Sequence, residues 1–302
     1  MCETEENTCN TSVRHLLPKM FAPVVKLISD TYIGSAIHSS SATLDRKIKA
    51  LSSRLLGAVL HGNRIVSING VRYFLPDTEV ETLFVLLPQY EKHVWRYLRP
   101  TKGQVFIDVG AHVGKYAMQV APIVGKEGLV IALEPDLNNY EALLRSIELN
   151  SLENIVPFNV AAWHDNCRLK LYNAVVSIYH SVKIDAGSGW VVVEARTIDS
   201  IVDELGVEHV DWVKIDVEDA EVEVLRGLEK TLLRHRPNII LEIQYRNMDA
   251  IRKFAAARDY TLSPIVEEQT PRSNAGLFFA TARRRRFDIE AEDRLNAWKT
   301  AD

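Results

Sequence analysis

The most informative part of this 302-residue sequence is residues 105–116, which read VFIDVGAHVGKY. An apolar run leads through two glycines into a helical pattern, in which Ala117, Val120 and Val124 fall on one face. A turn rich in glycine lets a ligand lie against the backbone, because no Cβ stands in the way. The stretch therefore predicts a strand, a ligand-binding turn and a helix in direct succession.

Strand-like and helix-like segments alternate after this stretch. Apolar runs that predict strands lie at residues 129–133, 155–160, 212–215, 239–243, 261–265 and 277–281, and helical patterns lie at residues 137–147, 221–233 and 248–258. Residues 165–195 are less regular and predict an inserted hairpin. The alternation implies an α/β fold, a mostly parallel sheet with helices on both faces and with its functional groups at the carboxyl ends of the strands.

The sequence before the first of these strands has a different pattern. Residues 64–75 hold two β-rich runs around Asn69-Gly70, the dipeptide that supplies both positive φ angles of a type I′ turn, so we expect a β-hairpin. A helix is expected over residues 90–98. Residues 1–62 show helical patterns that predict an accessory cap or a self-association element.

Composition and charge exclude several classes of protein. The chain has 36 Lys and Arg against 40 Asp and Glu, a net charge of −4, and 47% hydrophobic residues, which are ordinary values for globular proteins. Collagen-like, disordered and disulfide-framework chains are therefore excluded. The charge also gives no support to wholesale nucleic-acid binding.

Cysteines and targeting signals bear on location. The three cysteines, Cys2, Cys9 and Cys167, have neither CxxC spacing nor a histidine at zinc-ligand spacing, so no structural metal site is expected. The first residues are acidic where a signal peptide is basic, and the apolar run at residues 21–28 is too short to cross a bilayer. We therefore expect a cytoplasmic protein without a membrane span.

Two strand ends predict the cofactor. Gly110 and Gly114 are spaced GxxxG, not the GxGxxG that brings a pyrophosphate onto a helix N-terminus, which argues against a nicotinamide dehydrogenase. Asp108, at the end of the first strand, repels phosphates and suits an ammonium group, and Glu134, at the end of the second, can accept both hydroxyls of a ribose. A ligand with an amino-acid end and a nucleoside end is S-adenosylmethionine, the cofactor that this sequence predicts.

Five motifs make the prediction more specific. They are DVGAHVG at residues 108–114, IALEPD at 131–136, NVAAW at 159–163, TID at 197–199 and VKIDVEDAE at 213–221. Together they resemble the FkbM family of class I S-adenosylmethionine-dependent methyltransferases, over roughly residues 88–245. The resemblance implies the Rossmann-like, seven-stranded class I methyltransferase sheet and O-methylation of natural products or glycans. The chain then divides into a helical accessory region (1–62), a β-hairpin and linking helix (63–100), a methyltransferase domain (101–282) and a basic then acidic tail (283–302).

The residues expected to bind the cofactor precede the first strand or follow the ends of the first four strands. They are Tyr90, Glu91, Asp108, Gly110, Ala111, His112, Gly114, Glu134, Pro135, Asn159, Ala161, Ala162 and Asp216. Asn159 or the backbone after it is expected to meet the adenine edge, with Leu133 or Pro135 on the adenine face.

Two positions depart from the pattern of the family. His112 stands where the family usually has Asn, and we expect it to donate a hydrogen bond to the methionine portion of the cofactor. Asp219 stands where the family usually has Gly, and we expect it to add a charge beside the active site.

The candidate catalytic residues centre on the fourth strand. Lys214, Asp216 and Glu218 alternate with apolar residues, so the three side chains are expected on one side. Asp216 and Glu218 are candidates for acceptor binding or proton removal, and Lys214 for orienting them or stabilising developing negative charge. Glu242, on the adjacent strand, and His180, in the irregular insertion, complete the set. No metal is expected, because the cluster lacks a clear third and fourth ligand.

The leading hypothesis is a methyltransferase that acts on a hydroxyl of a small molecule, sugar or glycan. One alternative is an RNA or other nucleic-acid methyltransferase, because the four arginines at residues 283–286 can contact phosphates, although acidic residues follow them. Another is a non-catalytic cofactor-binding or scaffolding protein that forms homo-oligomers through the N-terminal helices.

Overall fold

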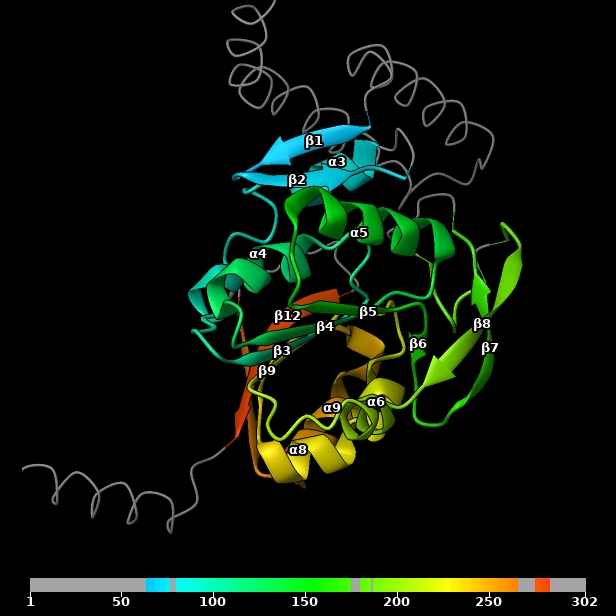
Figure 1. Cartoon of the computed structure of the whole chain (residues 1–302). Helices are drawn as coiled ribbons and strands as arrows, with labels where there is room; N and C mark the ends of the chain where they lie inside the picture. Colours follow the sequence, from blue (N-terminus) through cyan, green and yellow to red (C-terminus); the bar gives the residue numbers. More distant parts are fainter. Residues whose placement is uncertain (1–63, 77–79, 175–179, 186, 266–274, 283–302) are drawn as a thin grey trace, which may run out of the picture.

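The computed structural model describes residues 64–76, 80–174, 180–185, 187–265 and 275–282 (Figure 1). Its central element is a seven-stranded sheet in the order β11-β12-β10-β9-β3-β4-β5. The strands are β3 (Val105–Val109), β4 (Leu129–Leu133), β5 (Ile155–Phe158), β9 (Trp212–Ile215), β10 (Asn238–Gln244), β11 (Tyr260–Pro264) and β12 (Ala275–Ala282). From β10 to β5 the strands run parallel, and β12 is antiparallel to both of its neighbours. The predicted mostly parallel sheet is confirmed.

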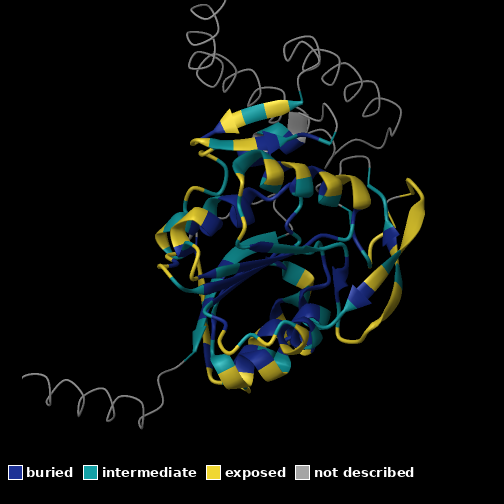
Figure 2. Cartoon of the chain, viewed as in Figure 1, coloured by how far each residue is buried: buried dark blue, intermediate teal, exposed yellow. Residues whose placement is uncertain are grey.

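Helices cover both faces of this sheet, because its central strands are apolar on both sides. One face lies under α4 (Lys115–Val124) and α5 (Leu137–Asn150), and the other packs against α6 (Ile198–Glu204), α7 (Glu221–Gly227), α8 (Glu229–His235) and α9 (Met248–Ala256) (Figure 1). Successive strand residues serve opposite layers, so Phe106 packs on the α4 side and Ile107 on the α6 side. Figure 2 shows the resulting concentration of buried residues in the central strands.

The turn after β3 lies between two other strand ends. Val109, the last residue of β3, pairs with Leu133 of β4 on one side and with Ile215 of β9 on the other. The residues that follow these three strands therefore meet at one edge of the sheet, as the parallel arrangement predicts.

The predicted N-terminal hairpin is confirmed as β1 (Ile65–Ile68) and β2 (Val71–Phe74). Asn69 and Gly70 have φ angles of 52° and 81°, the positive values that the turn requires. The hairpin lies on α5, where the Oγ of Ser146 accepts the backbone N–H of Phe74 at 2.9 Å.

The prediction of a helix at residues 90–98 is wrong. The structure has α3 (Val80–Leu86), a series of turns and the short 3₁₀ helix η1 (Val94–Arg96). Glu91 has a φ of 52°, and a left-handed residue cannot continue a right-handed helix. The local pattern did not reveal this conformation, because the partners of Glu91 lie on α4.

The predicted insertion is confirmed as a small sheet of β6 (Ala161–Ala162), β7 (Cys167–Tyr172) and β8 (Trp190–Arg196), with β7 and β8 antiparallel. The helix predicted at residues 221–233 is instead divided into α7 and α8. Asp199 provides the reason, because its carboxylate oxygens accept the backbone N–H groups of Lys230 and Thr231, each at 2.9 Å. These contacts begin a new helix at that point.

Several predictions concern residues outside the described part of the chain. They are the N-terminal helices of residues 1–62 with Cys2 and Cys9, the four arginines at 283–286 and the remainder of the tail to residue 302. Across the described ranges, no helix combines the length and the apolar character needed to cross a membrane.

Candidate active site

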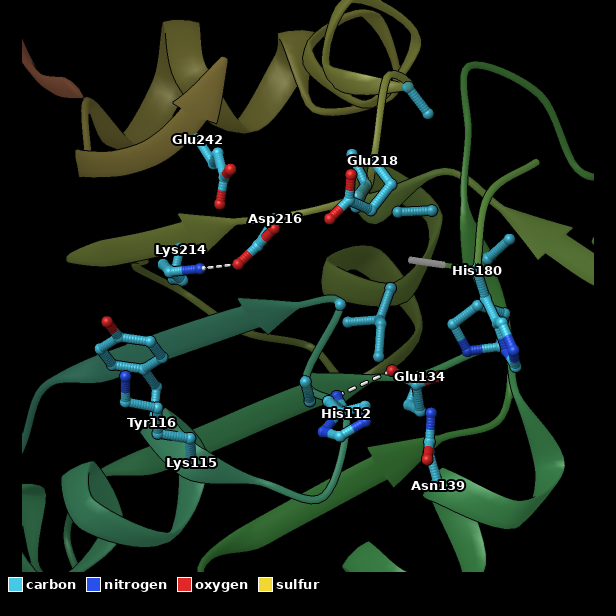
Figure 3. A pocket seen from close by; sticks show the side chains of 18 of the residues that line it. His112, Lys115, Tyr116, Glu134, Asn139, His180, Lys214, Asp216, Glu218 and Glu242 are labelled. Carbon is cyan, nitrogen blue, oxygen red and sulfur yellow. Dashed lines mark hydrogen bonds and ion pairs between the residues drawn. The ribbon is translucent and has the colours of Figure 1, made fainter. Parts of the chain in front are cut away.

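A cavity of about 220 Å³ lies at the carboxyl ends of β3, β4 and β9 (Figure 3). The predicted site residues that line it are Tyr90, Glu91, Gly110, Ala111, His112, Glu134, Pro135, Ala161, Ala162, His180, Lys214, Asp216, Glu218 and Glu242. Asp108, Gly114 and Asn159 are not among its lining residues. Lys115, Tyr116 and Asn139 line it without having been predicted.

The glycine turn after β3 forms one wall of the cavity. Gly110 has a φ of 77°, and a Cβ on it would lie 1.8 Å from the backbone oxygen of Asp216, so no larger residue fits. The N–H groups of Gly110 and Ala111 both donate to the carbonyl of Leu133, at 3.0 and 2.9 Å. The turn is thus held between the ends of β4 and β9.

Glu134, at the end of β4, is 5% exposed and faces this turn. Its Oε2 accepts the N–H of His112 at 2.7 Å, and its Oε1 accepts the N–H of Asp136 at 3.0 Å. Burial raises the pKa of Glu134 to about 7, against the lowering effect of these two N–H groups. The Asn139 side chain also hydrogen-bonds to this carboxylate, but a carboxylate has about four acceptor directions, so the group can still accept a hydroxyl from a ligand in the cavity.

Three predicted cofactor residues shape the site from outside its lining. Asp108 is 1% exposed, and its Oδ2 accepts the N–H of Ala117 at 2.9 Å, which anchors the first turn of α4. Gly114 is the N-cap residue of that helix, with a φ of 92°. The side-chain amide of Asn159 donates to the carbonyls of Glu134 and Pro135 at 2.9 and 3.1 Å. Asp108 and Asn159 therefore support the backbone through hydrogen bonds, and Gly114 supplies the left-handed turn that begins α4.

Two ion pairs, each with a buried lysine, form the opposite wall. The Nζ of Lys214 lies 2.9 Å from the Oδ2 of Asp216, and the Nζ of Lys115 lies 3.0 Å from the Oε2 of Glu91. The same Glu91 oxygen accepts the hydroxyl of Tyr116 at 2.7 Å. Burial alone would raise the pKa of Glu91, but the charges of Lys115 and Lys214 hold it below its ordinary value. Burial likewise opposes the charge of Lys214, yet Asp216 and Glu91 raise its pKa above its ordinary value.

Lys115 and Tyr116 follow the glycine turn directly, as the first residues of α4. Their position in the 105–116 stretch was a signal that they face the strand ends. Their partner Glu91 was expected near the cofactor, but its pairing depends on the tertiary structure.

Two further carboxyl groups extend this wall. Burial, followed by the charge of Asp216, raises the pKa of Glu218 to about 8, and the same two causes raise the pKa of Glu242 well above its ordinary value. One oxygen each of Glu91, Asp216 and Glu242 lies within 4.8 Å of the others. The chain already provides counter-cations here, because Lys115 and Lys214 bind two of the three carboxylates.

The family model described as the methyltransferase FkbM domain matches residues 108–263, just over half of the chain. This chain belongs to the FkbM methyltransferase family. The match includes the glycine turn, Glu134 and the Lys214 to Glu218 segment, but not Glu91, which precedes it.

The similar individual proteins match this chain over very different shares of their own length. The AMB antimetabolite synthetase AmbE of Pseudomonas aeruginosa is 44% identical over 48 residues, which are 16% of this chain and 2% of that protein. A solved FkbM methyltransferase from Methylobacillus flagellatus KT is 20% identical, with 66% of this chain and 54% of that chain covered and a TM-score of 0.45. Fibrillarin of Aeropyrum pernix, solved with natively bound S-adenosylmethionine, is 16% identical, with 74% and 84% covered and a TM-score of 0.43. The chain thus spans a small part of the curated relative and about half of the solved FkbM protein.

The two departures from the FkbM pattern occupy left-handed backbone positions. His112, where the family usually has Asn, has a φ of 52°, a conformation in which both Asn and His are enriched. Asp219, where the family usually has Gly, has a φ of 88°, which explains the usual glycine.

The expectation that Asp219 adds a charge beside the active site agrees with its position next to Glu218, a cavity residue whose pKa the charge of Asp219 helps to raise. The carboxylate of Asp219 is bound by the side chains of Arg246 and Asn247 in the short helix η3 (Tyr245–Asn247), and Asp219 does not line the cavity. The Arg246 guanidinium therefore pairs with the extra charge, while that charge still acts on the neighbouring Glu218.

His180 lies apart from the other candidate catalytic residues of this FkbM protein. Its Nδ1 is 3.4 Å from the Oδ2 of Asp136, just beyond the end of β4. Figure 3 shows it on the side of Glu134, away from Lys214 and Glu242. The structure thus places His180 at the predicted ribose end of the cavity and not in the fourth-strand cluster.

Proposed function

We propose that this chain is an S-adenosylmethionine-dependent methyltransferase that methylates a hydroxyl of a small molecule, sugar or glycan. One observation carries the proposal: a single cavity joins the buried Glu134 and its glycine turn to the cluster of Lys214, Asp216, Glu218 and Glu242. Family membership supports methyl transfer, and the arrangement of the residues supports the division of the cavity into a cofactor end and an acceptor end.

The end of the cavity near β4 suits the nucleoside of the cofactor. Glu134 would accept a ribose hydroxyl through the acceptor capacity that its present donors leave free, while the backbone N–H groups of His112 and Asp136 and the side chain of Asn139 keep the carboxylate in place. Apolar side chains of Leu133, Pro135 and Val160 line the same end and suit the faces of an adenine. When bound, the cofactor supplies a methyl group already activated on a sulfonium.

The fourth-strand end suits an uncharged acceptor. The positive charges of Lys115 and Lys214 balance those of Glu91 and Asp216, while the raised pKa values of Glu218 and Glu242 favour their neutral forms near pH 7. A hydroxyl that receives a methyl group must lose its proton, and the ionised form of Glu218 or Asp216 can take it from within hydrogen-bond reach. Lys214 would hold Asp216 in position and stabilise negative charge that develops on the acceptor oxygen.

The direct test is incubation of the purified full-length protein with methyl-labelled S-adenosylmethionine and a cell extract, followed by fractionation of the label. We expect label on a small-molecule, sugar or glycan fraction. Label on RNA would support the nucleic-acid alternative, and cofactor binding with no transfer to any fraction would support a non-catalytic binding protein. Calorimetry that finds tight NAD binding and no S-adenosylmethionine binding would overturn the proposal.

Two variants separate the ends of the cavity. We expect Glu134→Ala to weaken cofactor binding about tenfold or more, because it removes hydrogen bonds to a charged acceptor. Asp216→Asn should leave the affinity for the cofactor largely intact and abolish turnover. Equal loss of cofactor affinity in both variants would contradict the role given to the fourth strand.

A further inference from the structure

Residues 180–184, which we call the strap, connect the two ends of the cavity. His180 lies against Asp136 beyond β4, and Val182 lines the cavity. Ser181 is bridged to Tyr172 at the end of β7, with backbone hydrogen bonds of 2.8 and 3.2 Å in the two directions. The strap thus holds a defined position between the inserted sheet and the active-site cavity.

Ser181 makes a side-chain contact across this junction. The residue is 1% exposed, and its hydroxyl donates to the backbone carbonyl of Glu218 at 2.6 Å. The same Oγ accepts the N–H groups of Lys183 and Ile184 at 3.1 and 3.2 Å. One buried hydroxyl therefore fixes the turn of the strap and ties it to the segment after β9.

That segment has an unusual backbone. Glu218 and Asp219 are consecutive non-glycine residues with φ angles of 46° and 88°. Conformations of this kind persist only where surrounding contacts enforce them, and they gather at functional sites. Arg246 and Asn247 bind the carboxylate of Asp219, while the carbonyl of Glu218 is bound by Ser181.

The carboxyl of Glu218 is directed into the cavity by this backbone. Its Oε2 accepts the side-chain amide of Gln244 on β10 at 3.2 Å. With an ordinary extended or helical φ at this position, the side chain of Glu218 would point in a different direction, because φ sets the direction of the Cα–Cβ bond relative to the preceding peptide. The two left-handed residues therefore determine what Glu218 can reach.

We propose that Ser181 is a positioning residue, whose hydroxyl holds the left-handed backbone of Glu218 so that the carboxyl remains in the cavity. The effect on methyl transfer rests on the proposed function, but the effect on Glu218 does not. Ser181 touches neither end of the cavity itself, and acts through the carbonyl it binds.

The test compares Ser181→Ala with Ser146→Ala in the full-length protein. Ser146 is a matched control, since it is also fully buried, its hydroxyl also donates to a carbonyl, that of Ala142 at 2.8 Å, and its Oγ also accepts a backbone N–H. It lies on α5 beneath the hairpin and not at the cavity. Both variants lose buried hydrogen bonds, so a loss of stability alone does not distinguish them.

The decisive measurement is the pKa of Glu218. It is obtained by carbon-13 NMR titration of protein labelled at its glutamate side chains, in which the Glu218 signal is assigned as the one that disappears in Glu218→Gln. The wild-type pKa is raised to about 8 by burial and by Asp216. The other charged groups around Glu218 are Glu221, Lys214, Asp219 and Glu242. In Ser181→Ala we expect Glu218 to reach solvent and its pKa to fall toward the ordinary glutamate value of about 4, whereas Ser146→Ala should leave it at the wild-type value.

An unchanged Glu218 pKa in folded Ser181→Ala, or an equal fall in Ser146→Ala, overturns the proposal. If Ser181→Ala does not fold, Ser181→Cys takes its place, because a thiol is a weaker hydrogen-bond donor of similar shape. A Glu218 pKa equal to that of the wild type in Ser181→Cys would also overturn the proposal. Where the wild type transfers label, we also expect Ser181→Ala to lower kcat about tenfold with an unchanged cofactor Kd. Absence of transfer by the wild type would overturn the proposed function and leave the pKa test intact.

Discussion

Replacement of Lys214 by Met tests whether the fourth-strand cluster is held together by a buried charge. Lys214 is 2% exposed and lies 2.9 Å from Asp216, whose side chain is 28% exposed. Methionine keeps the length and apolar volume of the side chain but leaves carboxylates without their cation. Breaking a buried pair in this way costs about 3–5 kcal/mol, which corresponds to a fall in Tm of roughly 6–20 °C for a domain of this size.

Lys102→Met is the matched control. The Nζ of Lys102 also lies 2.9 Å from a carboxylate oxygen, that of Glu127, but the two side chains are 73% and 62% exposed. Water screens such a pair, so its loss should leave Tm nearly unchanged. The two variants remove ion pairs of equal length and differ in burial.

The loss in Lys214→Met should also depend on pH, measured by thermal unfolding followed by circular dichroism. The pKa of Lys214 is raised in the fold, so its stabilising effect is complete at pH 7 and is lost only as the pH rises above about 10. The pKa of Glu91 is lowered by Lys115 and Lys214, so the stability it contributes is present above about pH 4 and is lost below it. The difference between variant and wild type should therefore shrink as the pH falls below about 4. Equal melting temperatures of the two methionine variants at pH 7 would refute the reasoning.

Two further predictions concern the cofactor end. Gly110→Ala should lower the free energy of unfolding, measured in urea, by more than about 2 kcal/mol, because a left-handed alanine is strained and its Cβ would meet Asp216. Gly103 is the control, since it has a φ of 80° and nothing within 4 Å of its Cβ position, so Gly103→Ala should lose only the stability that the backbone strain costs. Equal losses in the two variants would contradict this. The pKa of Glu134 near 7 predicts that S-adenosylmethionine binds about tenfold more tightly at pH 8 than at pH 6 in calorimetry, since ribose hydroxyls favour the ionised carboxylate, and Glu134→Gln should remove this dependence. A dependence retained in Glu134→Gln would assign it to another group.

The sheet and its glycine turn could be predicted from local pattern because the physical cause is local. Strands buried on both faces read as short apolar runs, and the turn after β3 needs glycine wherever backbone approaches backbone. Parallel pairing then brings the ends of such strands to one edge, so Glu134 and Asp216 could be assigned to the same site from their positions alone.

The pairings within the site could not be predicted in this way. Glu91 and Lys115 belong to segments with no common pattern, and the left-handed conformation of Glu91 is not encoded by glycine. Asp108 was expected at the ligand because strand geometry locates a residue but not the partner of its carboxylate, which proved to be the N–H of Ala117.

The sequence by itself determined the family, the order of strands and helices, and the edge of the sheet where chemistry gathers, because periodicity and short motifs depend on neighbouring residues. Only the tertiary structure decided that His180 lies beside Asp136, that Arg246 pairs with Asp219, and that Ser181 binds the carbonyl of Glu218. These contacts join residues 27 to 44 positions apart, counted from their numbers in the chain. Their direction and distance are set by packing between layers, which no local pattern records.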